Sequence, residues 1–191
     1  MRKLINNGLV LVFLTGCTTS GVSVLERADG LSSSPSWAST TKASYKKDGS
    51  NYFVGYVTVE GRASPSAAMN ASDEKALSSP MQSLVSQFMD QNQVGEDLQN
   101  TTGQRIISSL RSERIPMPSL QITSRYWERV RIPEDAGGYR TELRAYSLAE
   151  VSEPDFMRAR EIAFRKLQGK PEIKSLLDEV GKAQREKALS N

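Results

Sequence analysis

The 191-residue chain contains no histidine and a single cysteine. Without histidine, the chain by itself cannot build a Ser-His-Asp triad, a Cys-His pair or a histidine metal site. Without a second cysteine, it cannot form an intrachain disulfide, a zinc ribbon or a redox CxxC pair. The sequence also has no glycine-rich phosphate loop and no EF-hand pattern. These absences favour a binding or structural protein, and we predict no enzymatic activity, no cofactor and no metal site.

Long hydrophobic runs are absent too, since Leu9–Leu14 is far shorter than the roughly 20 residues that cross a bilayer as a helix. The run follows a positively charged start and ends at small residues, which is the order of a secretory signal. Its end, Leu14-Thr15-Gly16-Cys17, resembles a bacterial lipobox, in which the signal is cut before the cysteine and the cysteine takes diacylglycerol and a fatty acid such as palmitate. We therefore predict a signal peptide over residues 1–16 and lipidation at Cys17. The alternatives are an ordinary signal peptide with a chance cysteine, or a buried structural thiol.

Removal of the signal lowers the charge of the mature chain. The 25 Lys+Arg and 22 Asp+Glu give a formal charge of +3, and loss of Arg2 and Lys3 leaves +1. Such a small net charge is not the basic balance typical of nucleic-acid binding, so we expect no nucleic-acid partner. Thr18 stands where an aspartate typically retains bacterial lipoproteins in the inner membrane. The expected location is the outer membrane, facing the periplasm.

Residues 17–50 are expected to form a tether between the lipidated cysteine and a folded domain. Serine and threonine dominate this segment and large apolar residues are few, so it cannot bury enough surface to fold alone. A flexible chain of this length has an r.m.s. reach of about 30 Å. Trp37 is the exception, and we expect it to pack against the following domain, with a partner or a lipid interface as the alternative.

The rest of the chain predicts an α+β fold, in which a small antiparallel sheet of about three strands packs against helices. Alternating residues predict a strand over 51–63 and a hairpin whose two strands flank the turn at 133–138. Helical periodicity predicts helices over 68–92, with a kink or break at Pro80, and over 94–114, broken near Gly103.

Two further helices are expected at the C-terminal end, the first of them capped by Ser152. We assign residues 51–150 to an α+β core domain and residues 151–191 to a C-terminal helical extension. The residues expected to be buried are Val54, Val57, Leu84, Phe88, Ile107, Ile122, Leu143 and Phe164.

The predicted hairpin carries the strongest candidate binding site. Arg125, Arg129 and Arg131 have the same parity on the first strand with Trp127 among them, and Arg140 and Arg144 share a parity on the second. We predict that they form one arginine and aromatic face, suited to a carboxylate-bearing glycan, a lipid phosphate or an acidic protein surface. The alternative is a solvated strand face whose charge is partly balanced by Glu128 and Glu142. The cations of the last helix are the next candidates: Lys174, Lys182, Arg185 and Lys187.

A catalytic pattern also occurs, because Ser-x-x-Lys appears at Ser44/Lys47 and at Ser72/Lys75. In penicillin-recognising enzymes this spacing places the lysine one helical turn from a serine nucleophile, but the partner motifs of those enzymes are missing. Carboxylate pairs that could serve glycan hydrolysis lie in stretches expected to be solvated surface. We therefore give neither pattern a catalytic role.

The order of features along the chain resembles one known family. After the lipobox come Pro35-Ser36-Trp37, the strand Phe53-Val54-Gly55-Tyr56, an alanine-rich helix from Ala67 and a later strand with Tyr126-Trp127. Between about Trp37 and Leu148 this order resembles the LPP-twenty-type, FlgP-like bacterial outer-membrane lipoproteins. The chain departs from that pattern at Ala71-Ser72, where an Ala-Arg helix start is expected, at Pro80 and in its C-terminal helices. The resemblance implies a lipid-anchored α+β domain that serves as a building block of an envelope assembly, such as a ring around a flagellar or secretion machine.

Two classes of function follow from the sequence. The first is a structural lipoprotein that is held at the outer membrane by its lipid and contacts envelope proteins or further copies of itself. The second is a periplasmic recognition module that binds peptidoglycan, lipid headgroups or an acidic protein through the arginine hairpin.

Overall fold

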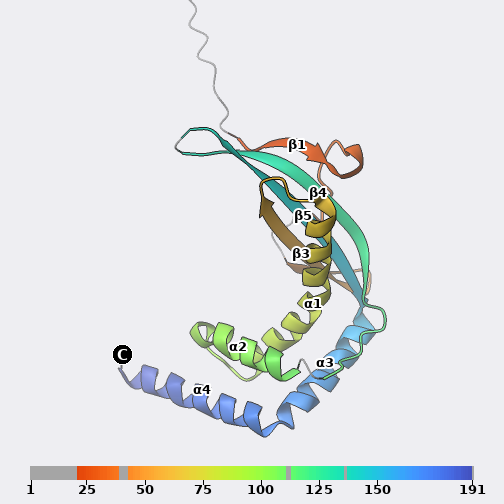
Figure 1. Cartoon of the computed structure of the whole chain (residues 1–191). Helices are drawn as coiled ribbons and strands as arrows, with labels where there is room; N and C mark the ends of the chain where they lie inside the picture. Colours follow the sequence, from red (N-terminus) through yellow and green to blue (C-terminus); the bar gives the residue numbers. More distant parts are fainter. Residues whose placement is uncertain (1–20, 39–42, 111–112, 136, 191) are drawn as a thin grey trace, which may run out of the picture.

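A computed structural model describes residues 21–38, 43–110, 113–135 and 137–190. Within them the fold is α+β, as predicted, but the antiparallel sheet has five strands instead of about three (Figure 1). The strands are β1 (Ser23–Arg27), β2 (Ser44–Lys47), β3 (Ser50–Glu60), β4 (Gln121–Pro133) and β5 (Tyr139–Ser152), in the spatial order β1-β4-β5-β3-β2. A short 3₁₀ turn, η1 (Ala28–Gly30), follows β1. The helices are α1 (Pro65–Gln91), α2 (Glu96–Leu110), α3 (Glu153–Gln168) and α4 (Pro171–Ser190).

The predicted hairpin is confirmed as the β4–β5 pair at the centre of the sheet. The two strands pair from Gln121 with Glu150 to Pro133 with Tyr139, and both curve along their length (Figure 1). At the turn, Gly137 and Gly138 have φ angles of 85° and 103°, a region that favours glycine. The glycines that signal the turn in the sequence are thus required by its geometry.

The described part of the expected tether belongs to the sheet. β1 pairs with β4 and β2 pairs with β3, so this segment supplies both edge strands. An edge strand gains backbone hydrogen bonds from a neighbour that is already ordered, and it therefore needs little apolar surface of its own. Low hydrophobicity does not predict this pairing, because an edge strand depends on a partner strand that is remote in the sequence. Cys17 lies outside the described residues.

The segment after β1 packs on the sheet as expected for Trp37. Trp37 and Tyr146 lie against a small buried cluster of Ala28, Ala38 and Tyr126. The Ser34 hydroxyl lies 3.1 Å from the Tyr126 hydroxyl. This segment covers the face of the sheet opposite α1, which we call the outer face; the face that α1 covers is the helix face.

Helix α1 is one helix of 27 residues that continues through Pro80. Its buried side chains recur at every fourth position: Ala68, Ser72, Ala76, Pro80, Leu84 and Phe88. A row of residues four apart winds slowly around a helix. Its small members in the first half lie against the sheet and allow a close approach, whereas Phe88 packs on Phe164 of α3. The expected break at Pro80 is therefore wrong, since the helix continues through Pro80, which is itself buried.

The C-terminal helices complete the core. Phe156 and Phe164 of α3 and Ile173 of α4 are buried in the same cluster as Phe53 and Phe88. The rings of Phe88 and Phe164 pack edge to face with centroids 5.3 Å apart. Residues 151–191, predicted as an extension, are in their described part integral to the core.

Four of the eight residues expected in the core are buried: Leu84, Phe88, Leu143 and Phe164. The other four, Val54, Val57, Ile107 and Ile122, are only partly buried. Helix α2 passes Gly103 unbroken, so the expected break there is wrong. A Cβ at Gly103 would lie only 3.1 Å from Met89 Cε of α1, so the two helices pack closely at this position. Gly103 thus serves helix packing rather than helix termination.

Candidate functional site

The register of the β4–β5 hairpin divides the predicted arginine face between the two faces of the sheet. Residues that lie directly opposite each other in an antiparallel pair point to the same side. Arg125 is opposite Ser147 and Trp127 is opposite Ala145, whereas Arg144 is opposite Glu128. Odd-numbered residues therefore lie opposite odd-numbered ones, and the turn places the two sets of arginines on different faces. Arg125, Trp127, Arg129 and Arg131 are on the helix face, and Arg140 and Arg144 are on the outer face, so the single face predicted from parity is wrong.

On the helix face, Arg125 fastens α1 to the sheet. Its Nε donates to both carboxylate oxygens of Asp73 at 3.0 and 2.9 Å. The Ser147 hydroxyl also donates to Asp73, at 2.5 Å, and lies 2.6 Å from the Ser72 hydroxyl. Burial alone would raise the pKa of Asp73, but the hydrogen bonds from Arg125 and Ser147 outweigh burial and lower it. Arg125 is thus committed to a contact within the fold.

Trp127 and Arg131, the neighbours of Arg125 on the helix face, differ in their exposure to solvent. Trp127 is partly buried against a cluster that includes Ala68 and Leu143. Arg131 is exposed, and its guanidinium lies 5.3 Å from the ring centroid of Tyr139. Only Arg131 of these two is available to a partner in water.

On the outer face, arginines and carboxylates alternate across the strands. Glu142 lies 3.0 Å from Arg140 and 3.4 Å from Arg144, and Arg144 is also 4.0 Å from Glu128. Glu128 and Glu142 are both buried, and they balance much of this arginine charge. The Tyr126 hydroxyl donates to Glu128 at 2.8 Å. This network connects the hairpin to the segment that covers it.

Tyrosines pack beside this network. The ring of Tyr146 has its centroid 4.8 Å from that of Tyr56 and 5.9 Å from that of Tyr126. Burial, followed by the nearby Tyr56 and Glu128, raises the pKa of Tyr146 to about 12. Tyr146 therefore stays neutral at physiological pH and acts as a packing residue.

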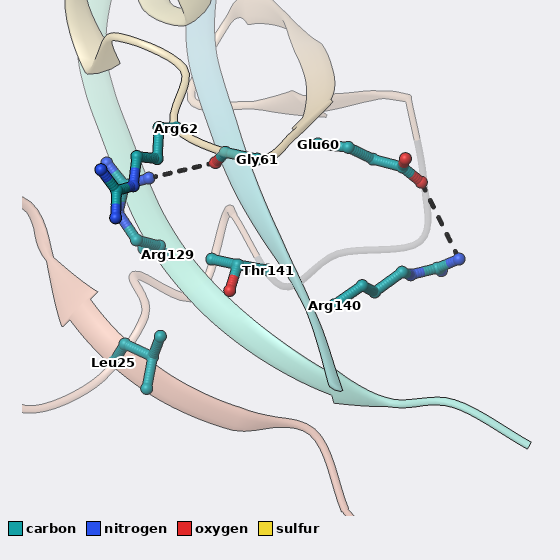
Figure 2. A pocket seen from close by; sticks show the side chains of 7 residues that line it. All are labelled: Leu25, Glu60, Gly61, Arg62, Arg129, Arg140 and Thr141. Atoms are coloured by element: carbon teal, nitrogen blue, oxygen red, sulfur yellow. Dashed lines mark hydrogen bonds and ion pairs between the residues drawn. The ribbon is translucent and has the colours of Figure 1, made fainter. Parts of the chain in front are cut away.

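Arg129 of the helix face and Arg140 of the outer face both line an open hollow of about 870 Å³ at one end of the sheet (Figure 2). We call it the arginine hollow, and its lining residues are Leu25, Glu60, Gly61, Arg62, Arg129, Arg140 and Thr141. It forms where β3 ends at Glu60 and the chain turns at Gly61, which has a φ angle of 78°. After this turn the chain leads to α1, so the first residues of β5, before Glu142, extend beyond the last residue of β3.

Two of the three arginines in the hollow are held by the fold. Arg129 donates to the carbonyl oxygens of Gly61 and Ala63 at 3.4 and 3.5 Å, and lies 3.4 Å from Glu26 of β1. Arg140 is 3.9 Å from Glu60 (Figure 2). Sequence reasoning includes these two but not Arg62, Glu60 or Leu25, because a hollow at a strand end depends on the sheet order. The one local signal for it is Gly61 at the end of an alternating segment.

The Ser-x-x-Lys patterns have structural explanations. The Ser72 hydroxyl is buried and donates to the Met69 carbonyl oxygen at 2.8 Å, while the Lys75 ammonium donates to the Tyr56 carbonyl oxygen at 3.1 Å. Ser44 and Lys47 lie on a strand, where a spacing of three places side chains on opposite faces. Ser72 and Lys75 do lie one turn apart on α1, but their side chains bond different backbone carbonyls, and Ser44 and Lys47 are not on a helix.

Within the described ranges, no group of three or more acidic or cysteine side chains is placed to hold a metal ion. In the same part of the chain, no helix combines the length and apolar character needed to cross a membrane. Of the C-terminal cations, Lys174, Lys182, Arg185 and Lys187 are exposed on α4. Comparisons with protein-family models, curated proteins and solved structures find no match to this chain.

Proposed function

We propose that the protein is a lipoprotein of the outer membrane that faces the periplasm and serves as a structural component of a cell-envelope machine, such as a flagellar or secretion-associated ring. The observation that carries the anchor is the sequence Leu14-Thr15-Gly16-Cys17 after a short apolar run. The resemblance to LPP-twenty-type lipoproteins supports the role in an assembly.

Features of the fold are compatible with assembly through its surface. The sheet is open, and its two edge strands, β1 and β2, have backbone donors and acceptors on their outer sides. Most of the arginine charge of the hairpin is used within the fold, which favours a structural role over an extended recognition face. Edge strands of two copies, or of this chain and a partner, can pair without rearrangement of the core.

The anchor is tested by Cys17→Ser. This variant lacks the sulfur that would carry the lipid, so it should leave the membrane fraction or accumulate unprocessed. The measurement is fractionation of cells in high salt together with the intact mass of the peptide that contains Cys17. A Cys17→Ser protein that still fractionates with the outer membrane would contradict the anchor.

The assembly role is tested on the lipidated chain extracted in mild detergent. We expect a multi-copy assembly, or a complex with an envelope partner, by size exclusion with light scattering and by crosslinking in cells. A protein that is monomeric in detergent and gives no crosslinks in the envelope would contradict this role.

A second candidate function is recognition of peptidoglycan, lipid headgroups or an acidic protein through the arginine-bearing hairpin. The observation that favours it is the arginine hollow, where three arginines line a depression that contains one carboxylate, Glu60. The candidate ligands share an anionic group that the planar guanidinium binds through two parallel hydrogen bonds.

A further inference from the structure

The distance between the proposed anchor and the sheet is short. β1 begins at Ser23, the sixth residue after Cys17. Since an extended chain spans at most about 3.6 Å per residue, six residues reach about 22 Å whatever their conformation. The start of β1 therefore lies within that distance of a lipid attached to Cys17.

This restraint determines which end of the molecule faces the membrane. Ser23 is opposite Arg131, close to the turn of the β4–β5 hairpin, and Glu26 of β1 contacts Arg129 in the arginine hollow. In Figure 1, β1 and the hairpin turn lie at one end of the molecule, and α2 and α4 lie at the other. The hollow is therefore at the end that the anchor would hold at the membrane.

The surface at this end suits the headgroup layer. Large hydrophobic side chains are exposed here, with exposed fractions of 50% for Val22, 37% for Val24, 46% for Leu25 and 67% for Tyr139. Leu25 is the extra residue where the register of β1 shifts, and it lines the hollow beside the arginines (Figure 2). Apolar and tyrosine side chains beside cations are typical of protein surfaces at a membrane interface.

The charges at this end favour a phosphate in the hollow. The lining carries three arginines and one carboxylate, Glu60. Glu26 lies 3.4 Å from Arg129 and Glu142 lies 3.0 Å from Arg140, so the charges of these two arginines are balanced and Arg62 is the arginine that can attract an anion. Among the residues that the structure describes, none makes a hydrogen bond or an ion pair with the Arg62 side chain. The hairpin turn carries the acidic residues Glu134 and Asp135, which repel an anion. The attraction for an anion is therefore confined to the hollow and does not extend over the whole hairpin.

We propose that the arginine hollow binds the phosphate of a lipid headgroup in the same membrane that holds the anchor. The sheet then docks with β1 and the hairpin end toward the bilayer, and α2 and α4 point away from it. Arg62 provides the guanidinium that pairs with the phosphate, because the charges of Arg129 and Arg140 are balanced by Glu26, Glu60 and Glu142. Leu25 contacts the apolar part of the lipid. This inference rests on the proposed lipid anchor.

The test uses the lipidated chain with a cysteine introduced at Tyr139 or at Leu189, each labelled with a fluorophore. Lipid blocks Cys17, so the introduced cysteine is the only thiol. The proteins are placed in phosphatidylcholine vesicles with or without phosphatidylglycerol, and a nitroxide on the lipid headgroups quenches nearby fluorophores. We expect strong quenching at position 139, increased by phosphatidylglycerol, and little quenching at position 189 on α4. Equal quenching at the two positions would overturn the proposal.

The variant Arg62→Gln tests whether the hollow causes the docking on anionic vesicles. Loss of one arginine near an anionic surface should lower the ratio of docked to undocked protein about fivefold. Lys174→Gln removes the same charge from exposed α4 and should leave the ratio unchanged. Equal ratios for wild type and Arg62→Gln would overturn the assignment of the phosphate to the hollow.

Two further readouts separate the sources of failure. If inorganic phosphate changes the fluorescence at position 139 in detergent and no quenching occurs in vesicles, the ligand of the hollow is a soluble phosphate and the lipid proposal is overturned. An unmodified Cys17 peptide in the mass spectrum would overturn the anchor and the docking together. A lipidated peptide without quenching at position 139 would overturn the docking alone.

Discussion

Gly55 is the residue at which α1 comes closest to the sheet. A Cβ on Gly55 would lie 2.0 Å from the Ser72 carbonyl oxygen and 2.5 Å from the Ala76 nitrogen. Both are backbone atoms of α1 and cannot rotate away, so Gly55→Ala should lower the free energy of unfolding by about 1–3 kcal/mol or more. Gly181→Ala on α4 is the control, because its Cβ would meet only Arg185 at 3.7 Å and alanine favours a helix by up to about 1 kcal/mol. Similar urea midpoints for the two variants would contradict this close approach.

Asp73 makes the contact between α1 and the sheet sensitive to acid. Its pKa is lowered in the folded protein, so its contribution is fully present above the unfolded pKa and is lost as pH falls through the folded pKa. We expect the melting temperature to fall below about pH 4, near the ordinary pKa of aspartate. Asp73→Asn should melt lower than wild type at neutral pH, with the difference shrinking in acid. The measurement is the difference at each pH, because Glu113 and Asp155 also have lowered pKa values. A difference that stays constant between neutral pH and acid would argue against this role of Asp73.

At the scale of elements, the contact between the covering segment and the outer face depends on one tyrosine. The buried Tyr126 hydroxyl bonds Glu128 and lies beside Ser34. Tyr126→Phe should lower the free energy of unfolding by about 1.5–3 kcal/mol, as expected for a lost hydrogen bond to a charged group, and should speed proteolysis between Leu31 and Ser36. Tyr139→Phe, which alters a largely exposed side chain, should change neither. Equal proteolysis of both variants would show that Tyr126 does not hold the segment.

The elements also show what could be predicted from the sequence. The hairpin and the helix cap at Ser152, whose hydroxyl accepts from the Asp155 amide at 3.4 Å, are local features that neighbouring residues determine. The pairing of β1 and β2 depends on strands that are remote in the chain, and composition contains no sign of them. Which residues of one strand share a face is also a local property. Whether Arg125 and Arg144 share a face depends instead on the register of the two strands across the turn. Of the residues that line the arginine hollow, the sequence therefore predicts Arg129 and Arg140 but not Arg62, Glu60 or Leu25, and it does not predict how they are arranged.

For the whole molecule, α4 belongs to the core and should be needed for folding. Ile173, Leu176 and Val180 are buried, and full burial of such a side chain contributes about 1.5–3 kcal/mol. Truncation after Gly169 should therefore give a protein that is insoluble or melts much lower. Truncation after Arg185 removes only the last part of the helix, where Leu189 is exposed, and should change the melting temperature little. A stable protein that ends at Gly169 would instead support the predicted extension.

The strand order also sets a sequence of events during folding. Glu26 of β1 contacts Arg129, which lies 103 positions further along the chain. β1 therefore has no partner strand to pair with until β4 has been synthesised and has reached the same compartment. Contacts between such distant segments form late, because a long loop must close first. In a chain that is exported from its N-terminal end, the first segment to arrive is thus among the last to join the fold. For the proposed lipidation, this delay gives the processing enzymes a period in which Cys17 is on unpaired polypeptide, before β1 draws it toward the folded body.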